Sequence, residues 1–500
     1  MPSAKLPLFL CLIAGVCPAT NLTGNWLLAT PNGDGTLRRT YFRLKQQNGS
    51  ITGTIRATLH LYTIDKSSGD AKNFTISAGM AILGGERRVT FRGKLAGDEL
   101  EVSEVTAHGE GAAMTAHRVP EGEGALPARI EPPALHPVRD NGLARTPPMG
   151  WNSWNKFANH IDDATVRGIA DAMAQNGMRE AGYLYVNIDD TWEGERDAQG
   201  NIHPNRKFPN MKALADYVHS KRLKLGIYSS PGPNTCEGYE GSYGHEAQDA
   251  RTYAAWGIDY LKYDWCGAFT IYKDSEMQAV YQKMGDALLA SGRDIVYSLC
   301  QYGIENVWRW GPKAGGNLWR TGGDISDSWE SVSRIGFSVL PLAPYARPGH
   351  WNDPDMLEIG NGHMTDTEYR THMSLWSMLA APLIAGNDLR KMSASTRDIL
   401  MNREVIAVDQ DPLGLPARRV WQSGEQEVWT RELVNGDTAL AVFNRAAGDA
   451  KVTLRWADAQ LSNTPSNVRN LWCHTDERAI APVYSAYVPG HGVVLLRVRL

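Results

Sequence analysis

Apolar positions along the central part of the chain follow two alternating patterns. Between about residue 142 and residue 412, short β-branched or aromatic runs alternate with segments whose apolar residues recur every three or four positions. The segment 165–176 is of the second kind, because it places Val166, Ile169, Ala170 and Met173 on one face before Gly177. Similar patterns predict a helix that begins at Asn210 and another that runs from Met277 to Leu288.

Eight strand-like runs lie between the predicted helices. They end near Trp154, Asp190, Ser230, Asp264, Cys300, Asp324, Asp355 and Asn387. Eight strand–helix units in roughly 250 residues is the size of a (β/α)8 barrel, whose active site lies at the carboxyl ends of its strands. We therefore expect an α/β fold, with a TIM barrel over residues 142–412.

The regions on either side of the barrel have the alternation of antiparallel strands. Residues 20–119 contain such runs at 22–26, 41–44, 51–55 and 89–93, separated by Asn, Gly and Asp clusters. Residues 413–500 contain others at 427–430, 439–443, 452–454 and 492–496. We expect an N-terminal antiparallel β-domain, a proline-rich linker over 120–141, and a C-terminal antiparallel β-sandwich.

The first nineteen residues have the pattern of a secretory signal peptide. Lys5 precedes an apolar run over 6–16, and small and turn-forming residues follow at 18–20. A buried first strand is the alternative, but the run lacks period-two alternation. We expect a secreted or periplasmic protein, and the sequence leaves open whether the mature chain is free or lipid-anchored. No later run is long enough for a membrane span.

Composition excludes several classes of partner. The chain is 42% hydrophobic and 21% charged, with a net charge of −4, which argues against a nucleic-acid or anionic-membrane partner. Cys11 and Cys17 would leave with the signal if cleavage falls near Ala19, and Cys17 is the residue that an acyl anchor would use. Cys236, Cys266, Cys300 and Cys473 remain, at spacings that fit no zinc pattern. In an oxidising compartment we expect one disulfide and two free thiols among these four.

Charged residues gather at the predicted carboxyl ends of the barrel strands. An Asp at the end of one strand is often only a helix N-cap, but acids recur at four of the eight ends with cations beside them. A ring of carboxylates around one pocket costs stability, so a functional role is expected. The residues are Asp189, Asp190, Lys262, Asp264, Arg320, Asp324, Asp353 and Asp355.

Such a ring suits either a divalent metal or glycoside hydrolysis. A metal site is disfavoured because His203, His350 and His363 lie in loops without ligand spacing and because Lys262 and Arg320 flank the acids. We expect no metal and no cofactor. Glycoside hydrolysis needs one ionised and one protonated carboxyl group. Lys262 stands two residues before Asp264 and would help to keep it ionised, and the glycines before Asp324 leave room for a mobile acid.

Six short motifs follow one another at the spacing of the predicted barrel strands. They are MGWNSW at 149–154, IDDTW at 188–192, GIY at 226–228, YLKYDWC at 260–266, RTGGDI at 320–325 and WNDPDML at 351–357. In this order they resemble glycoside hydrolase family 27, which contains the α-galactosidases (melibiases) and α-N-acetylgalactosaminidases. The resemblance covers about residues 142–415 and extends to the β-sandwich that usually follows; the N-terminal β-domain is an addition of the bacterial type.

The resemblance implies a retaining exo-α-galactosidase that acts on carbohydrate substrates. It implies that Asp264 is the nucleophile and Asp324 the general acid/base. It also implies that Asp189 and Asp190 bind the O4 and O6 side of the sugar and that Lys262 and Arg320 bind ring hydroxyls. Trp154 and Tyr228 would line the pocket, Asp355 and Met356 would lie near its rim, and Cys236 would pair with Cys266.

One residue departs from the family pattern. Gln301 stands where many family α-galactosidases have Glu and the N-acetylgalactosaminidases have a small Ser, in a region that governs the space around O2. Because Gln is not small, we predict poor tolerance of a 2-acetamido group. A β-L-arabinopyranosidase, an α-N-acetylgalactosaminidase and an isomaltosyl-releasing hydrolase are the alternatives on the same site. The Asp189–Asp190 pair favours galactose among these glycones.

Two alternatives come from different functional classes. A non-catalytic sugar-binding protein would be expected to lack Asp264 or Asp324, and both are present. A metal-dependent isomerase would lose activity to chelators. For the N-terminal β-domain the sequence leaves open a carbohydrate-binding module, with Trp26, Tyr41 and Tyr62 available, or a packing domain. The sequence is also compatible with assembly of the chain into a homo-oligomer.

Overall fold

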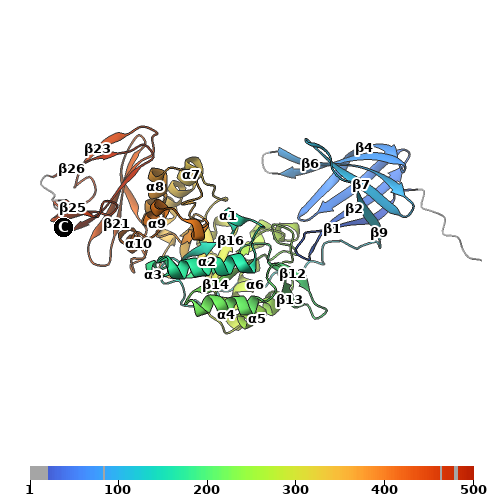
Figure 1. Cartoon of the computed structure of the whole chain (residues 1–500), viewed down its shortest axis with the longest axis horizontal. Coiled ribbons are helices and arrows are strands. Elements are labelled where there is room, and N and C mark those ends of the chain that lie inside the picture. The colour runs from blue at the N-terminus through green and yellow to red at the C-terminus, as the bar shows by residue number, and fades with distance from the viewer. Residues whose placement is uncertain (1–20, 83–84, 462–463, 478–481, 500) are drawn as a thin grey trace, which may run out of the picture. The chain divides into compact units, whose positions relative to one another are not determined.

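The computed structural model describes residues 21–82, 85–461, 464–477 and 482–499 (Figure 1). The predicted signal peptide over 1–19, with Cys11 and Cys17, lies outside the described residues. The chain forms two compact units. One comprises the described residues up to 32 together with 37–125, and the other comprises 33–36 together with the residues from 126 onward.

The N-terminal unit is an antiparallel sheet that closes on itself. Its strands are neighbours in the order β6-β5-β4-β3-β2-β1-β9-β7-β8, and β6 also pairs with β7. Alternate side chains point inward, so Trp26, Phe42, Ile55 and Phe74 form its core. The strands are β1 (Gly24–Pro31), β2 (Leu37–Gln47), β3 (Ser50–Ala57), β4 (His60–Asp70), β5 (Asn73–Ile82), β6 (Gly85–Ala96), β7 (Glu99–Thr106), β8 (Gly109–Glu110) and β9 (Met114–Val119).

Two of the three aromatic residues considered for sugar stacking are core residues of this unit. Trp26 is fully buried and its indole N–H donates to the Leu22 carbonyl, and Tyr62 is 2% exposed. Tyr41 is half-buried, with the Arg56 guanidinium over its ring. A carbohydrate-binding module built on these rings is therefore not supported, because a ring that stacks on a sugar has to reach the surface.

The second unit contains an eight-stranded parallel sheet in the order β18-β17-β16-β15-β14-β11-β10-β19. The sheet curls until Leu357, just after β18, pairs with Ala385 of β19 in a parallel bridge. This is the parallel barrel that the alternating pattern predicts. The strands are β10 (Met149–Asn152), β11 (Tyr185–Asn187), β14 (Lys224–Ser229), β15 (Tyr260–Asp264), β16 (Val296–Cys300), β17 (Leu318–Arg320), β18 (Trp351–Asp353) and β19 (Leu383–Ala385).

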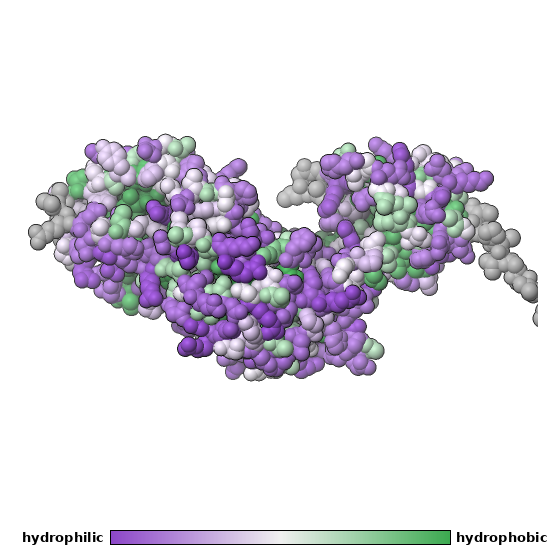
Figure 2. Space-filling view, in the orientation of Figure 1, coloured by the Kyte–Doolittle hydropathy of each residue, from purple (hydrophilic) through white to green (hydrophobic). Residues whose placement is uncertain are grey.

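Amphipathic helices cover the barrel, and the helix predictions are confirmed. In α2 the predicted inward residues are buried, and the Asp162 side chain caps the helix by accepting from the Thr165 N–H. The visible face of this unit is mainly hydrophilic, as Figure 2 shows. The helices are α1 (Trp154–Phe157), α2 (Asp163–Gln175), α3 (Met178–Ala181), α4 (Met211–Ser220), α5 (Glu246–Trp256), α6 (Met277–Ala290), α7 (Trp329–Val339), α8 (Asp366–Leu379), α9 (Ala394–Leu400) and α10 (Arg403–Asp409).

Several barrel strands end earlier than the sequence suggested. Strands β10, β11, β17 and β18 end at Asn152, Asn187, Arg320 and Asp353, two to four residues before the predicted ends. The parallel ladder between β17 and β18 stops at the pair Arg320–Asp353. The acids beyond these points therefore lie on loops above the barrel, where side chains are free to turn toward a common pocket.

A β-sandwich follows the barrel, as predicted. A sheet in the order β20-β21-β22-β27-β24-β25 packs against the pair β23–β26 through Val428, Leu440, Val452, Leu454 and Val488. Its strands are β20 (Arg418–Ser423), β21 (Gln426–Glu432), β22 (Thr438–Asn444), β23 (Ala450–Arg455), β24 (Asn467–Asn470), β25 (Thr475–Glu477), β26 (Val483–Val488) and β27 (Val493–Arg499).

Two features outside these sheets complete the second unit. The hairpin β12 (Glu193–Arg196) and β13 (Ile202–Pro204) follows β11. The segment 126–141 has no helix or strand, but hydrogen bonds hold it to the barrel, as between the Val138 N–H and the Lys313 carbonyl. Among the described residues, none of the helices is long and apolar enough to span a membrane.

Candidate active site

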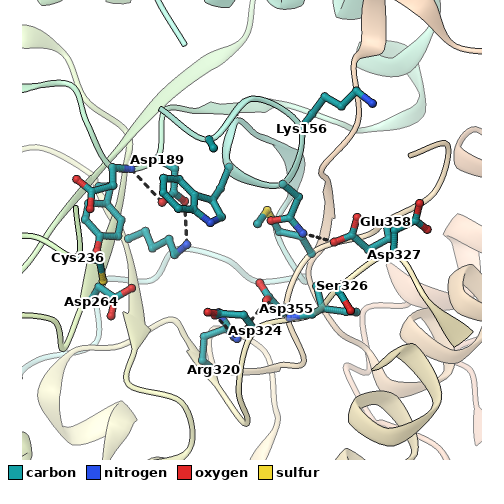
Figure 3. Close-up of a pocket in the computed structure, with 18 of the residues that line it drawn as sticks. Lys156, Asp189, Cys236, Asp264, Arg320, Asp324, Ser326, Asp327, Asp355 and Glu358 are labelled. Atoms are coloured by element: carbon teal, nitrogen blue, oxygen red, sulfur yellow. Dashed lines mark hydrogen bonds and ion pairs between the residues drawn. The ribbon is translucent and has the colours of Figure 1, made fainter. Parts of the chain in front are cut away.

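A pocket of about 840 Å³ lies at the carboxyl ends of the barrel strands (Figure 3). The residues to which the family resemblance gave a role line it, with the exception of Gln301, although the sequence placed several of them on strands rather than loops. They are Trp154, Asp189, Asp190, Tyr228, Cys236, Lys262, Asp264, Cys266, Arg320, Asp324, Asp355 and Met356. Asp353, another acid of the predicted ring, ends β18 and is not part of the lining.

Asp189 and Asp190 form one wall of the pocket. The Asp189 carboxylate accepts from Asn152 Nδ2 at 2.7 Å and from Lys262 Nζ at 2.8 Å. The two oxygens of Asp190 accept from the backbone N–H groups of Thr191 at 2.6 Å and Glu237 at 2.9 Å. Burial nevertheless raises the pKa of Asp190 to about 7. The pair thus offers carboxylate oxygens to the hydroxyl groups of a ligand. Keeping the buried Asp190 ionised destabilises the protein when no ligand is bound.

Lys262 is the cation at the centre of this wall. Its side chain is 15% exposed and its ion pair is with Asp189, not directly with Asp264. Burial lowers the pKa of Lys262, but the surrounding carboxylates, Asp189 first, outweigh burial and raise it. Lys262 therefore stays charged, and its positive charge acts on Asp264 through space.

Asp264 ends strand β15 and is 4% exposed. Burial raises its pKa, while the Lys262 charge and hydrogen bonds from Tyr302 and Cys300 oppose that rise. The Tyr302 hydroxyl donates to Asp264 Oδ1 at 2.9 Å. A buried carboxylate with few donors is poorly solvated, which suits a nucleophile that has to form a bond to carbon.

Asp324, unlike Asp264, is an exposed acid. Its side chain is 74% exposed and accepts from Arg320 at 3.1 Å. A Cβ added to Gly322 or Gly323 would meet nothing within 4 Å, so the loop before Asp324 has open space around it. Arg320 itself is 3% exposed and also pairs with Asp355 at 3.1 Å, which fixes the guanidinium. The ion pair with Arg320, whose guanidinium Asp355 fixes, thus positions the exposed Asp324 carboxyl group at the mouth of the pocket.

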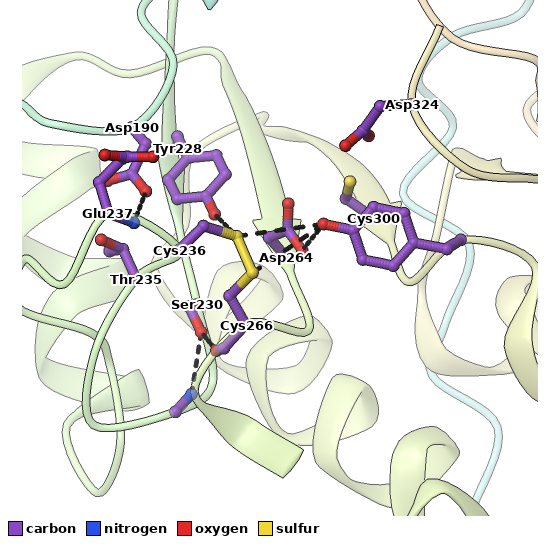
Figure 4. Close-up of a disulfide and its surroundings, with 12 residues drawn as sticks. Asp190, Tyr228, Ser230, Thr235, Cys236, Glu237, Asp264, Cys266, Cys300 and Asp324 are labelled. Carbon is purple, nitrogen blue, oxygen red and sulfur yellow. Dashed lines mark hydrogen bonds between the residues drawn. A yellow bond between two sulfur atoms is a disulfide. The ribbon is translucent and has the colours of Figure 1, made fainter. Parts of the chain in front are cut away.

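Cys236 and Cys266 form the one disulfide in the described part of the chain, as the family resemblance implied (Figure 4). The bond ties the loop after β14 to the loop after β15, beside Asp264. The Tyr228 hydroxyl donates to Cys236 Sγ at 3.0 Å. Cys300 is a buried free thiol and Cys473 an exposed one, which matches the expected count. The crosslink holds the wall next to Asp264.

Gln301 is the exception among the predicted site residues. It is fully buried, is not part of the pocket lining, and neither atom of its side-chain amide has a partner among the described residues. The next residue, Tyr302, lines the pocket instead. Tyr302 was not predicted as a pocket residue, because a one-residue change at the end of a strand reverses the direction of the side chain.

The end of the pocket away from Asp189 is polar and was also missed. Glu358 accepts from Asn155 and, at 2.6 Å, from Asn361 Nδ2, and burial raises its pKa to about 7. Lys156 and Asp327 line the same end (Figure 3). These residues come from α1 and from loops that follow predicted strand ends, but they belong to none of the motifs that the sequence analysis used.

The described residues contain one cluster with the spacing of a metal site, Cys236, Asp264 and Cys266. The two sulfurs are joined to each other, so they are not available as thiolate ligands. His363 lines the pocket, whereas His350 is buried against the Gly316 carbonyl and His203 contacts Asp197. The three histidines therefore share no ligand set.

Comparisons with known proteins agree with this geometry. A family model described as alpha galactosidase A matches residues 146–411, and one described as the alpha galactosidase C-terminal beta sandwich domain matches residues 423–498. An alpha-galactosidase from Cyamopsis tetragonoloba is 48% identical over 359 residues, 71% of this chain and 86% of the relative.

Two further similarities come from a bacterium and a fungus. Alpha-galactosidase A from Cellvibrio japonicus is 46% identical over 379 residues, 71% of this chain and 92% of the relative. The crystal structure of alpha-galactosidase I from Mortierella vinacea superposes with a TM-score of 0.69 and 38% identity, covering 72% of this chain and 98% of that one.

Proposed function

We propose that this chain, which belongs to the α-galactosidase family (glycoside hydrolase family 27), is a retaining exo-glycosidase that removes terminal α-D-galactosyl residues from oligosaccharides or glycoconjugates. The observation that carries the proposal is the pair Asp264 and Asp324 on one pocket of a chain whose relatives are α-galactosidases. One of these acids is buried and the other is exposed, so two carboxyl groups with different surroundings line the same pocket.

In the first step a carboxylate oxygen of Asp264 attacks C1 of the galactosyl group. The new C1–O ester bond forms as the glycosidic C1–O bond breaks, and Asp324 gives its proton to the departing oxygen. In the second step Asp324 takes a proton from water, the water oxygen bonds to C1, and the ester breaks to restore the Asp264 carboxylate. Two inversions at C1 give net retention.

The remaining lining residues support recognition of a sugar. Asp189 and Asp190 present acceptors for hydroxyl groups, and Lys262 and Arg320 present charged donors. Trp154 and Tyr228 add ring surface to the same pocket. The polar end around Glu358 and Asn361 favours a hydrophilic leaving group such as a second sugar.

The test is a matched set of p-nitrophenyl glycosides: α-galactoside, α-N-acetylgalactosaminide, β-L-arabinopyranoside and α-glucoside, with Asp264→Asn as control. We expect fast release from the α-galactoside, lost in Asp264→Asn, and the α-anomer of galactose as the first product by NMR. Preference for the arabinoside or the acetamido sugar would contradict the assigned glycone. A first-formed β-anomer would contradict the retaining mechanism.

We also infer that the protein is exported. The support is the apolar run over 6–16 after Lys5 and the disulfide beside the site, since disulfides persist in oxidising compartments. Expression of the full chain should yield a periplasmic or extracellular product whose first residue lies near position 20. Recovery of the uncleaved chain in the cytoplasm would contradict the inference.

A further inference from the structure

The loop after β16 has an unusual backbone. Tyr302, Glu305 and Asn306 have φ of 62°, 55° and 52°, left-handed values that cost a non-glycine residue on the order of 1 kcal/mol each. Gly303 between them also has positive φ, and a Cβ there would collide with the Thr321 carbonyl. Such strain persists only where the surrounding structure enforces it, and it gathers at functional sites.

The left-handed turn at Tyr302 directs its side chain into the pocket. The hydroxyl lies 2.9 Å from Asp264 Oδ1 and donates to it. The Arg320 guanidinium lies 5.6 Å from the centre of the ring. The hydroxyl is also 3.9 Å from Cys266 Sγ and 4.0 Å from Cys236 Sγ, so the disulfide limits how far it moves.

Among the groups around Asp264, Tyr302 is the strong hydrogen-bond donor that contacts the carboxylate directly. The Lys262 ammonium is engaged by Asp189, and the Arg320 side chain by Asp324 and Asp355. Asp324 adds a like charge and the Cys300 thiol is a weak donor. The other titratable groups facing Asp264 are the phenols of Tyr228 on β14 and Tyr281 on α6, both kept neutral by burial, which raises their pKa.

Tyr302 stays a donor at every working pH. Burial raises the pKa of its phenol far above the usual range, and the neighbouring Asp264 carboxylate raises it further. A hydrogen bond to the ionised form of a carboxyl group lowers that group's pKa. The phenol therefore opposes the effect of burial on Asp264 and holds one of its two oxygens in place.

We propose that Tyr302 is the residue that positions the nucleophile of this enzyme. Its hydroxyl binds Asp264 Oδ1 and leaves Oδ2 to form the bond to C1. In the glycosyl–enzyme ester the same hydroxyl hydrogen-bonds the carbonyl oxygen Oδ1, so it stabilises the carboxylate that leaves when water attacks C1. The inference rests on the proposed function and adds a residue to its mechanism.

The experiment compares Tyr302→Phe with the wild-type chain on p-nitrophenyl α-galactoside across pH. Without the donor the pKa of Asp264 rises, so the acid limb of kcat/KM moves to higher pH by about one unit. Because the ester loses a hydrogen bond to its leaving carboxylate, kcat falls about 10- to 100-fold. KM falls as well, since the covalent intermediate accumulates.

Tyr217→Phe is the matched control. Its hydroxyl also contacts a carboxylate, lying 2.8 Å from both oxygens of Asp171, but it joins α2 to α4 away from the pocket. We expect an unchanged acid limb in this variant. Replacement of Tyr302 by 3-fluorotyrosine keeps the shape and strengthens the donor, so it should move the acid limb to lower pH. This second replacement tests the inference even where the Phe variant folds poorly.

The possible failures are distinguishable. A wild-type chain that hydrolyses none of the four glycosides overturns the proposed function, and this inference with it. An active wild type with the same acid limb and the same kcat in Tyr302→Phe overturns only the role of Tyr302. A fall in kcat with unmoved acid limbs in both the Phe and the fluorotyrosine proteins would show a structural role and would also overturn the inference.

Discussion

Asp190→Asn should make the protein more stable at pH 8 and less stable at pH 4. Burial raises the pKa of Asp190 from 3.8 to about 7, so the folded state binds a proton there more tightly than the unfolded chain does. The stability that this proton confers is fully present below about pH 4 and is lost as the pH rises through about 7. A rise of about three pKa units means that an ionised Asp190, above pH 7, lowers the free energy of unfolding by about 4 kcal/mol, an order-of-magnitude figure.

The amide substitution removes that cost but loses one hydrogen bond. Both Asp190 oxygens accept from backbone N–H groups, those of Thr191 and Glu237, and an Asn side chain has only one acceptor oxygen. The resulting mismatch costs about 1–2 kcal/mol at any pH. We therefore expect a net gain of about 2–3 kcal/mol at pH 8 and a net loss of about 1–2 kcal/mol at pH 4.

The assay is calorimetric unfolding of wild type and variant between pH 4 and pH 8 at one scan rate. A gain of this size corresponds to a rise of roughly 5 °C in the barrel transition at pH 8. Asp249→Asn is the control, because it breaks a buried ion pair with Arg196, at 2.6 Å, and should destabilise the chain at both pH values. A lower Tm for Asp190→Asn at pH 8 would show that the ionised Asp190 carboxylate does not destabilise the folded chain.

Three further predictions address the site and its supports. Asp324→Asn should lose about 10²- to 10⁴-fold in kcat/KM on an α-galactosyl disaccharide. The loss should be much smaller on the p-nitrophenyl glycoside, because p-nitrophenolate leaves without a proton. Equal losses on the two substrates would contradict the acid role of Asp324. Replacing Cys236 and Cys266 together by Ser should lower the unfolding free energy by about 3–4 kcal/mol, since the disulfide closes a loop of 30 residues. An unchanged Tm would contradict a stabilising role for the disulfide. Gln301→Met should raise Tm, because the fully buried amide has no described partner, while activity on the α-N-acetylgalactosaminide stays low; a lower Tm would indicate that the amide is satisfied.

The periodicity of the sequence was sufficient to predict the barrel and the inward faces of its helices. In α2 and α4 the predicted residues are the buried ones, because a stripe that recurs with the helical period has only one face to present to a sheet. The pairing of Cys236 with Cys266 followed from the resemblance of the motifs to a known family. These features depend on residues close together in the chain or on patterns shared with relatives.

The contacts around Asp264, the proposed nucleophile, depended on the tertiary structure. Tyr302 and Asp264 are 38 positions apart, and Lys262 pairs with Asp189 across 73 positions, so neither contact leaves a local pattern. Gln301 was the expected pocket residue, but the left-handed backbone at Tyr302 turns the second side chain inward instead. Side-chain alternation is set by neighbouring residues, whereas the loops above a barrel are shaped by contacts between distant strands. Only closure of the barrel brings those strands together and decides which loop residue faces the pocket.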